Sequence, residues 1–138
     1  MPSSIAKALI TWYSENARDL PWRTTRDPYA IWISEVMLQQ TRVQTVLPYY
    51  QHWLQEFPTI DDLAKADFDH ILSLWEGLGY YRRAHNLHQT AQNVVTEMSG
   101  KLPENTDELR QLPGIGPYIA AAIVALAFNR DTIALDGN

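Results

Sequence analysis

Residues 112–128 read LPGIGPYIAAAIVALAF, a turn rich in glycine and proline that leads directly into an apolar run. A helix that precedes this stretch must stop before Pro113, while Pro117 suits the first turn of a new helix. The run Ile119–Phe128 is apolar on all sides, which is typical of a helix at the centre of a fold. We therefore expect two helices joined by a tight hairpin over about residues 105–128, with the second helix buried.

The remainder of the chain is dominated by apolar residues spaced three and four apart, and no stretch alternates polar and apolar residues between turns. This pattern predicts an all-α fold, a compact multi-helix bundle that forms one domain over residues 1–138. Arg23–Pro28 is expected to be a loop, and Pro48 either kinks its helix or ends it early. The other predicted helices cover about residues 5–13, 29–40, 43–57, a short segment capped by Thr59 and Asp62, 67–75, 87–98, and a segment capped by Asn105 and Glu108.

The composition excludes several classes of protein. Of the 138 residues, 46% are hydrophobic and 20% are charged, which suits one globular domain. The absence of cysteine rules out a disulfide framework, a cysteine nucleophile and a thiolate-bound metal within these residues. Neither a signal peptide nor a bilayer-spanning run is recognisable, so we expect a cytoplasmic protein. The net charge of −5 argues against nucleic-acid binding by charge alone.

The hairpin carries the first chemical signal. Gly114 and Gly116 permit a tight turn and leave backbone N–H groups exposed where the next helix begins, so its positive dipole end can hold a phosphate. The spacing matches helix-hairpin-helix motifs, which grip the DNA backbone without reading the bases. An ordinary turn between two helices is the alternative interpretation.

Glu35 is the second candidate, because its neighbours on the helix surface are mostly apolar. They are Ile31 and Leu38 on one side and Trp32 and Gln39 on the other. A carboxyl group in such surroundings resists ionisation, so we expect its pKa to rise toward neutrality, as a general acid requires. The alternative is a solvated glutamate at the edge of a helix.

A second carboxylate, Asp136, follows the buried helix. Breaking a glycosidic bond calls for one acid that protonates the leaving group and another that stabilises the sugar cation. Asp136 with Gly137 and Asn138 can equally form a simple turn, and the sequence does not place Asp136 beside Glu35.

Two polar segments are candidates for contact with nucleic acid. Residues 77–83, GLGYYRR, combine glycines, paired tyrosines and paired arginines, which suits unpaired bases and phosphates. Gln39, Gln40 and Thr41 follow an apolar stripe and can fill the gap that an extruded base leaves. The alternative is a capped helix end with solvated polar residues. His85 and His88 share a helix face without a patterned third ligand, so we assign no metal.

Together these motifs resemble the adenine DNA glycosylases of the MutY type, within the helix-hairpin-helix glycosylase superfamily. The resemblance rests on segments in one order along the chain: 20–23 (LPWR), 32–41 (WISEVMLQQT), 75–81 (WEGLGYY), the hairpin, and 136–138 (DGN). It implies a six-helix barrel core and a base-excision repair enzyme. Such an enzyme flips adenine mispaired with 8-oxoguanine or guanine into a pocket and cleaves its N-glycosidic bond.

The resemblance also implies roles for individual residues. Glu35 matches the acid that protonates adenine N7, and Asp136 matches the carboxylate that stabilises the sugar cation. Positions that support the pocket are Tyr118, Arg23 and Asn138. Residues that contact or wedge into the duplex are Gln39, Gln40, Thr41, Leu78 and Tyr80, and Gly114 and Gly116 belong to the DNA-gripping hairpin.

Tyr118 separates this chain from a related class of enzyme. Bifunctional glycosylase-lyases such as endonuclease III carry a lysine there, whose amine forms a Schiff base. Tyrosine cannot do so, and a monofunctional enzyme is expected.

The chain departs from the family at its end. The four cysteines of the family's [4Fe–4S] cluster and its C-terminal 8-oxoguanine-reading domain are absent, so we interpret the chain as an N-terminal catalytic-core fragment without its own cofactor. Because Asp136 then lies near a chain end, we expect the fragment by itself to be weakly active or inactive.

The expected partner is double-stranded DNA that contains an adenine mispair, bound by a monomer in the nucleoid of a bacterial-type cell, with no membrane contact. Three rival functions remain open: a glycosylase for another base, a helix-hairpin-helix DNA-binding module without catalysis, and a helical protein-interaction scaffold. Release of a defined base separates the first two.

Overall fold

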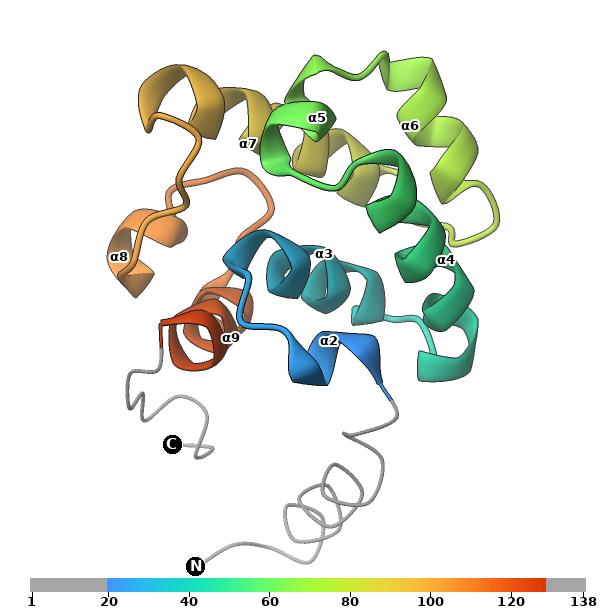
Figure 1. The fold of residues 1–138 in the computed structure, drawn as a ribbon, viewed down its shortest axis with the longest axis horizontal. Helices are drawn as coiled ribbons and strands as arrows, with labels where there is room; N and C mark the ends of the chain where they lie inside the picture. The colour runs from blue at the N-terminus through green and yellow to red at the C-terminus, as the bar shows by residue number, and fades with distance from the viewer. Residues whose placement is uncertain (1–19, 129–138) are drawn as a thin grey trace, which may run out of the picture.

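A computed structural model describes residues 20–128, and within this range all regular structure is helical (Figure 1). The all-α prediction is therefore confirmed. The helices are α2 (Pro21–Thr24), α3 (Pro28–Leu38), α4 (Val43–Glu56), α5 (Ile60–Lys65), α6 (Phe68–Trp75), α7 (Arg82–Glu97), α8 (Thr106–Leu109) and α9 (Pro117–Ala127).

Helix α3 lies at the centre of the described part of the chain, and α9 packs against it (Figure 1). The Asp27 carboxylate caps α3 by accepting from the Tyr29 backbone N–H at 3.1 Å, and Pro28 occupies the first turn. Every residue from 29 to 37 is buried, so α3 is enclosed on all sides instead of presenting one core stripe. In α9, residues 119–124 are buried, as the apolar run predicted.

The second layer consists of α4 to α7. Helix α4 packs against α3 and α6, and α7 packs against both α5 and α6. Helix α4 continues through Pro48, so the proline does not end it. Thr59 and Asp62 form a reciprocal capping box at the start of α5, and the Asn105 side chain accepts from the Glu108 N–H at 2.9 Å to begin α8. Both caps were predicted from the sequence.

One expectation about the start of the described range has a different outcome. The segment Arg23–Pro28 was expected to be a loop, but Pro21–Thr24 forms the short helix α2. Pro21 favours this turn because its fixed φ suits the first position of a helix. The predicted helix over residues 5–13 lies outside the described residues. Within the described range, no helix is both long and apolar enough to cross a membrane.

A buried hydrogen-bonded pair joins the two layers. The Tyr29 hydroxyl of α3 donates to the Phe57 carbonyl at 2.7 Å and accepts from Trp53 Nε1 at 3.2 Å. The Trp53 ring also meets the rings of Phe57 and Trp75 edge to face. Burial raises the pKa of the Tyr29 hydroxyl well above its ordinary value, so the hydroxyl keeps its proton and remains a donor.

This pair generates a stability prediction. Tyr29→Phe leaves a buried indole N–H and a buried carbonyl without a partner, so the free energy of unfolding should fall by about 1–3 kcal/mol. Tyr81→Phe removes an exposed hydroxyl that accepts a long hydrogen bond from the Gly77 N–H at 3.4 Å; because water can replace this bond, the free energy of unfolding should change by less than about 0.5 kcal/mol. Urea unfolding at pH 7, followed by circular dichroism, measures both. Equal stabilities for the two variants would contradict the assignment.

Candidate functional site

Glu35 lies in the second half of α3 and is only 4% exposed. Among residues 20–128 it is the only acid with a buried side chain, while the remaining buried polar residues are Ser34 and Thr90. Ser34 is satisfied by donating to the Ile31 carbonyl at 2.8 Å. The sequence predicted apolar surroundings for Glu35, and the structure encloses it between helices. A buried acid on a central helix is a candidate proton donor.

The chain leaves α3 through an exposed segment of three polar residues. Gln39 ends the helix, and its backbone N–H donates to the Val36 carbonyl at 3.2 Å. Gln40 is exposed and has a φ of +62°, in the left-handed region that non-glycine residues rarely occupy. Such a conformation costs roughly 1–2 kcal/mol for a residue with a Cβ. Surrounding contacts must therefore stabilise this loop.

A second exposed loop lies between α6 and α7. Gly77 has a φ of +99°, and a Cβ there would collide with the hydroxyl of Tyr49, which itself donates to the Glu76 carbonyl at 2.6 Å. Tyr80 has a φ of +50° and is 63% exposed. Leu78 is only 6% exposed, so its side chain lies in the core and not on the surface that Tyr80 occupies. Contact between Leu78 and DNA would require that side chain to leave the core.

Arg83, at the start of α7, connects these two loops. One terminal nitrogen, Nη1, reaches the carbonyl oxygens at the end of α3: Val36 (2.8 Å), Met37 (3.2 Å) and Gln39 (2.5 Å). The other, Nη2, reaches Thr41 Oγ1 (3.3 Å) and the carbonyl oxygens of Leu78 (3.4 Å) and Gly79 (3.3 Å). The guanidinium therefore satisfies helix-end carbonyls that have no partner within α3.

Aromatic rings complete the surroundings of this guanidinium. Its central carbon lies 5.0 Å from the centroid of the Trp75 ring and 5.6 Å from that of Tyr80. Burial lowers the pKa of Arg83, and the charge of Tyr80 opposes this shift. The sequence suggested Arg82 and Arg83 together as positive charge for phosphates. In the structure only Arg82 is exposed, because both terminal nitrogens of Arg83 are bonded within the protein.

The hairpin is held against the same face of α7. Gly114 has a φ of +80°, and a Cβ there would lie 2.9 Å from Asn86 Cβ. The fully buried Thr90 donates to the Pro113 carbonyl at 2.7 Å. Arg83, Asn86 and Thr90 follow one another at helical spacing, so one face of α7 contacts both loops and the hairpin. The sequence analysis missed Thr90 and the bridging role of Arg83, although this spacing was a signal.

Other predicted site residues are placed as follows. Gly116 immediately precedes α9, and no atom would lie within 4 Å of a Cβ there. Tyr118 lies in the first turn of α9 and is 54% exposed. Helix α9 packs against α3, the helix that carries Glu35. Arg23 belongs to α2. The predicted Asp136 and Asn138 lie outside the described residues.

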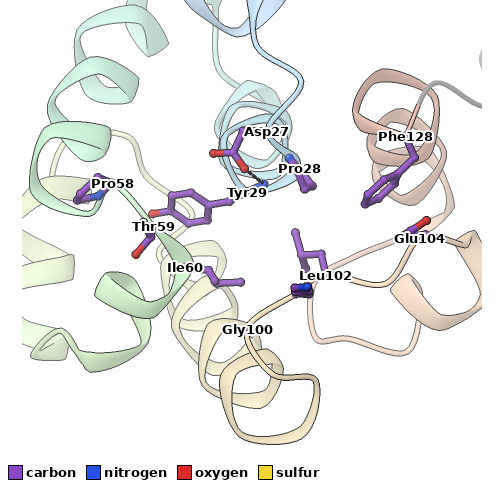
Figure 2. Close-up of a pocket in the computed structure, with 11 residues that line it drawn as sticks. Asp27, Pro28, Tyr29, Pro58, Thr59, Ile60, Gly100, Leu102, Glu104 and Phe128 are labelled. Carbon is purple, nitrogen blue, oxygen red and sulfur yellow. Dashed lines mark hydrogen bonds between the residues drawn. The ribbon is translucent and has the colours of Figure 1, made fainter.

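A cavity of about 340 Å³ opens elsewhere, at the N-terminal end of α3 (Figure 2). Its walls come from the start of α3, the turn before α5, the segment after α7 and Phe128 at the end of α9. None of the predicted site residues lines it. The Asp27 carboxylate at its edge is engaged in capping α3, and the lining is mostly apolar. Both acids in its lining, Asp27 and Glu104, are exposed, so neither is a buried acid, and Glu35 is the better candidate.

The part of the chain that the structure describes holds no group of three or more histidines, cysteines or acids that could bind a metal ion. His85 and His88 instead place their rings against Phe68, with centroids 5.5 and 5.7 Å away. The whole chain has no cysteine, so its residues cannot supply the thiolates of an iron–sulfur cluster.

Comparisons with known proteins agree with the motifs. The chain is 45% identical to the adenine DNA glycosylase of Rattus norvegicus, over 99% of this chain and 28% of that protein. It is also 45% identical to the adenine DNA glycosylase of Buchnera aphidicola subsp. Baizongia pistaciae, over 96% of this chain and 38% of that protein. The chain thus spans about a quarter to two fifths of these relatives.

A solved structure shares the fold. A thermostable thymine-DNA glycosylase superimposes with a TM-score of 0.79 at 32% identity, over 90% of this chain and 58% of that chain. The family model of the HhH-GPD superfamily of base excision DNA repair proteins matches residues 33–138. That range includes Glu35, both exposed loops and the hairpin. The chain belongs to the HhH-GPD superfamily of base excision DNA repair proteins.

Proposed function

We propose that this chain is the catalytic core of a monofunctional adenine DNA glycosylase that removes adenine mispaired with 8-oxoguanine or guanine. The observation that carries the proposal is Glu35, a buried acid on a helix whose end leads into an exposed loop. Relatives named adenine DNA glycosylase, 45% identical over almost the whole chain, support the choice of adenine as the target base.

Glu35 is assigned the proton transfer to the leaving group. In the proposed reaction its carboxyl proton moves to N7 of the extruded adenine, and the bond between C1′ and N9 breaks with its electron pair on the base. The resulting sugar cation is captured by water, and the proton that this water releases restores the Glu35 carboxyl group, directly or through solvent. Protonation of a leaving base by a positioned acid typically contributes 10²–10⁴-fold to the rate. Asp136 is assigned the stabilisation of the cation, by resemblance alone.

Extrusion of the base is assigned to the exposed loops. Removing a base from a duplex leaves a gap, and filling that gap offsets the cost of unstacking. Gln40 and Tyr80 are exposed at the tips of the two loops that Arg83 joins. Their amide and aromatic ring suit hydrogen bonding and stacking with the neighbouring bases.

The hairpin is assigned to the phosphate backbone of the duplex. Gly114, with a φ of +80°, allows the chain to turn closely before α9, and Gly116 directly precedes that helix in extended backbone. The first-turn N–H groups of α9 form the positive end of an 11-residue helix. This contact carries no base specificity and positions the duplex relative to Glu35.

Replacing the proposed acid tests the mechanism directly. In the full-length protein, Glu35→Gln should lower single-turnover release of adenine from an adenine:8-oxoguanine duplex by at least about 100-fold, because an amide cannot deliver the proton. Duplex affinity should be retained. Glu97→Gln, at an exposed position of α7, serves as the matched control and should leave the rate unchanged. A Glu35→Gln rate within about tenfold of wild type would place the acid elsewhere.

The absence of an amine at position 118 gives a second test. Borohydride added during turnover should trap no covalent protein–DNA adduct, because Tyr118 cannot form a Schiff base. Tyr118→Lys introduces that amine and serves as the positive control. The exposed Lys101 is the nearest alternative amine in sequence. An adduct in the wild-type protein that persists in Lys101→Ala would contradict the monofunctional assignment.

The hairpin glycine provides a third test. Gly114→Ala forces a Cβ into the left-handed region and against Asn86, so both stability and duplex affinity should fall, the former by about 1–2 kcal/mol. Gly116→Ala meets neither obstacle and should alter stability by less than about 0.5 kcal/mol. Affinity is measured by fluorescence anisotropy at a temperature where both variants are folded. Unchanged affinity in Gly114→Ala would remove the hairpin from the proposed interface.

Thymine is the second candidate target, because the thymine-DNA glycosylase shares this fold at 32% identity. Duplexes that contain adenine:8-oxoguanine, adenine:guanine and thymine:guanine pairs distinguish the two functions. Release of thymine from the thymine:guanine duplex, with no release of adenine from the other two duplexes, would favour a thymine-DNA glycosylase.

A further inference from the structure

We propose that Arg83 is a positioning residue that fixes two loops, residues 39–41 and 78–80, relative to each other so that their exposed side chains Gln40 and Tyr80 enter the duplex together. This inference rests on the proposed glycosylase function for its meaning in catalysis. The link between the two loops is a property of the fold and can be measured independently.

The hydrogen-bond acceptors of the Arg83 guanidinium belong to both loops. All six atoms that Arg83 contacts by hydrogen bonds are neutral oxygens, and they fall into two groups. Nη1 is bonded to the end of α3 and to Gln39, while Nη2 is bonded to Thr41 and to the loop before α7. A planar guanidinium with several donors in a fixed fork can bridge such groups, whereas the single ammonium of lysine cannot reach both.

The residues next to the hydrogen bonds of Arg83 have unfavourable backbone conformations. Gln40 and Tyr80 both have left-handed backbones, with φ of +62° and +50°. Bonds from Arg83 flank Gln40 on both sides, through the Gln39 carbonyl and the Thr41 hydroxyl. Another bond reaches the Gly79 carbonyl immediately before Tyr80. Unfavourable conformations of this kind persist where surrounding contacts over-determine them, and they gather at functional sites.

The guanidinium of Arg83 is not available to bind a phosphate. Its guanidinium is packed beside the rings of Trp75 and Tyr80 and is half-buried, unlike the exposed Arg82 next to it. Arg83 is therefore already engaged within the protein, unlike an exposed arginine that is available to a phosphate. Its position between the loops suits it to transmit the placement of one loop to the other, and to the helix that carries Glu35.

The test compares substrates that differ in the cost of extrusion, using the full-length protein. Arg83→Lys keeps the charge but not the fork, and Arg82→Lys is the matched control on the adjacent residue. Arg83→Lys should slow adenine release from an adenine:8-oxoguanine duplex by about tenfold or more, and by less than about threefold when adenine lies opposite an abasic site, because an unpaired base is cheaper to extrude. Arg82→Lys should leave the ratio of the two rates as it is in the wild-type protein.

A general loss of stability must be separated from this effect. Leu63→Ala removes a fully buried side chain of α5 and provides a destabilised reference outside both loops. It should not change the ratio of the two rates. An Arg83→Lys defect of equal size on both substrates would overturn the inference.

A second readout does not depend on catalysis. The backbone N–H groups of Thr41 and Leu78 are hydrogen-bonded in the two loops, to the carbonyls of Leu38 and Trp75. Hydrogen exchange at both should accelerate together in Arg83→Lys and stay unchanged in Arg82→Lys. Acceleration in neither loop, or in one loop alone, would overturn the inference. A wild-type protein that releases no adenine would instead refute the proposed function, while the exchange data still decide whether Arg83 joins the loops.

Discussion

The last carbonyls of a helix have no partners inside the helix, and at the end of α3 they meet the guanidinium of Arg83. That contact fixes where the helix stops and in which direction the polar residues after it leave. The same side chain reaches the loop before α7. Three residues on one face of α7, Arg83, Asn86 and Thr90, thus set the positions of both loops and the hairpin. Most of the candidate interface is arranged around this one helix face.

Complete enclosure of α3 explains how a carboxyl group can be kept away from water. Glu35 lies in a run of nine buried residues, and α9 covers the same helix from one side. Burial of an acid costs free energy, which the rest of the fold must offset. Tyr29 and Trp53 add a hydrogen-bonded connection to the outer layer. The central helix is therefore held at several points along its length, so that Glu35 has little freedom to move toward solvent.

Local features of this fold were predictable from the sequence, and long-range ones were not. Thr59 and Asn105 act as caps as expected, because capping involves residues only three positions apart. The sequence predicted apolar neighbours for Glu35 but left open a solvated position at the helix edge, and the packing of other helices around α3 buries it. Arg83 was misinterpreted because its partners lie up to 47 positions away, and no local pattern encodes a bond to a distant carbonyl. By resemblance Leu78 is expected to wedge into the duplex beside Tyr80, whereas in the structure its side chain is 6% exposed and lies in the core.

The bonds from Arg83 end mainly on main-chain oxygens, and this has an evolutionary consequence. A carbonyl group is present whatever amino acid occupies the position, so residues 39, 78 and 79 can change identity without losing the bond. Selection can then alter the side chains that face a substrate while the loop geometry persists. An enzyme built on this arrangement can acquire new surface side chains at these positions as long as the arginine is kept.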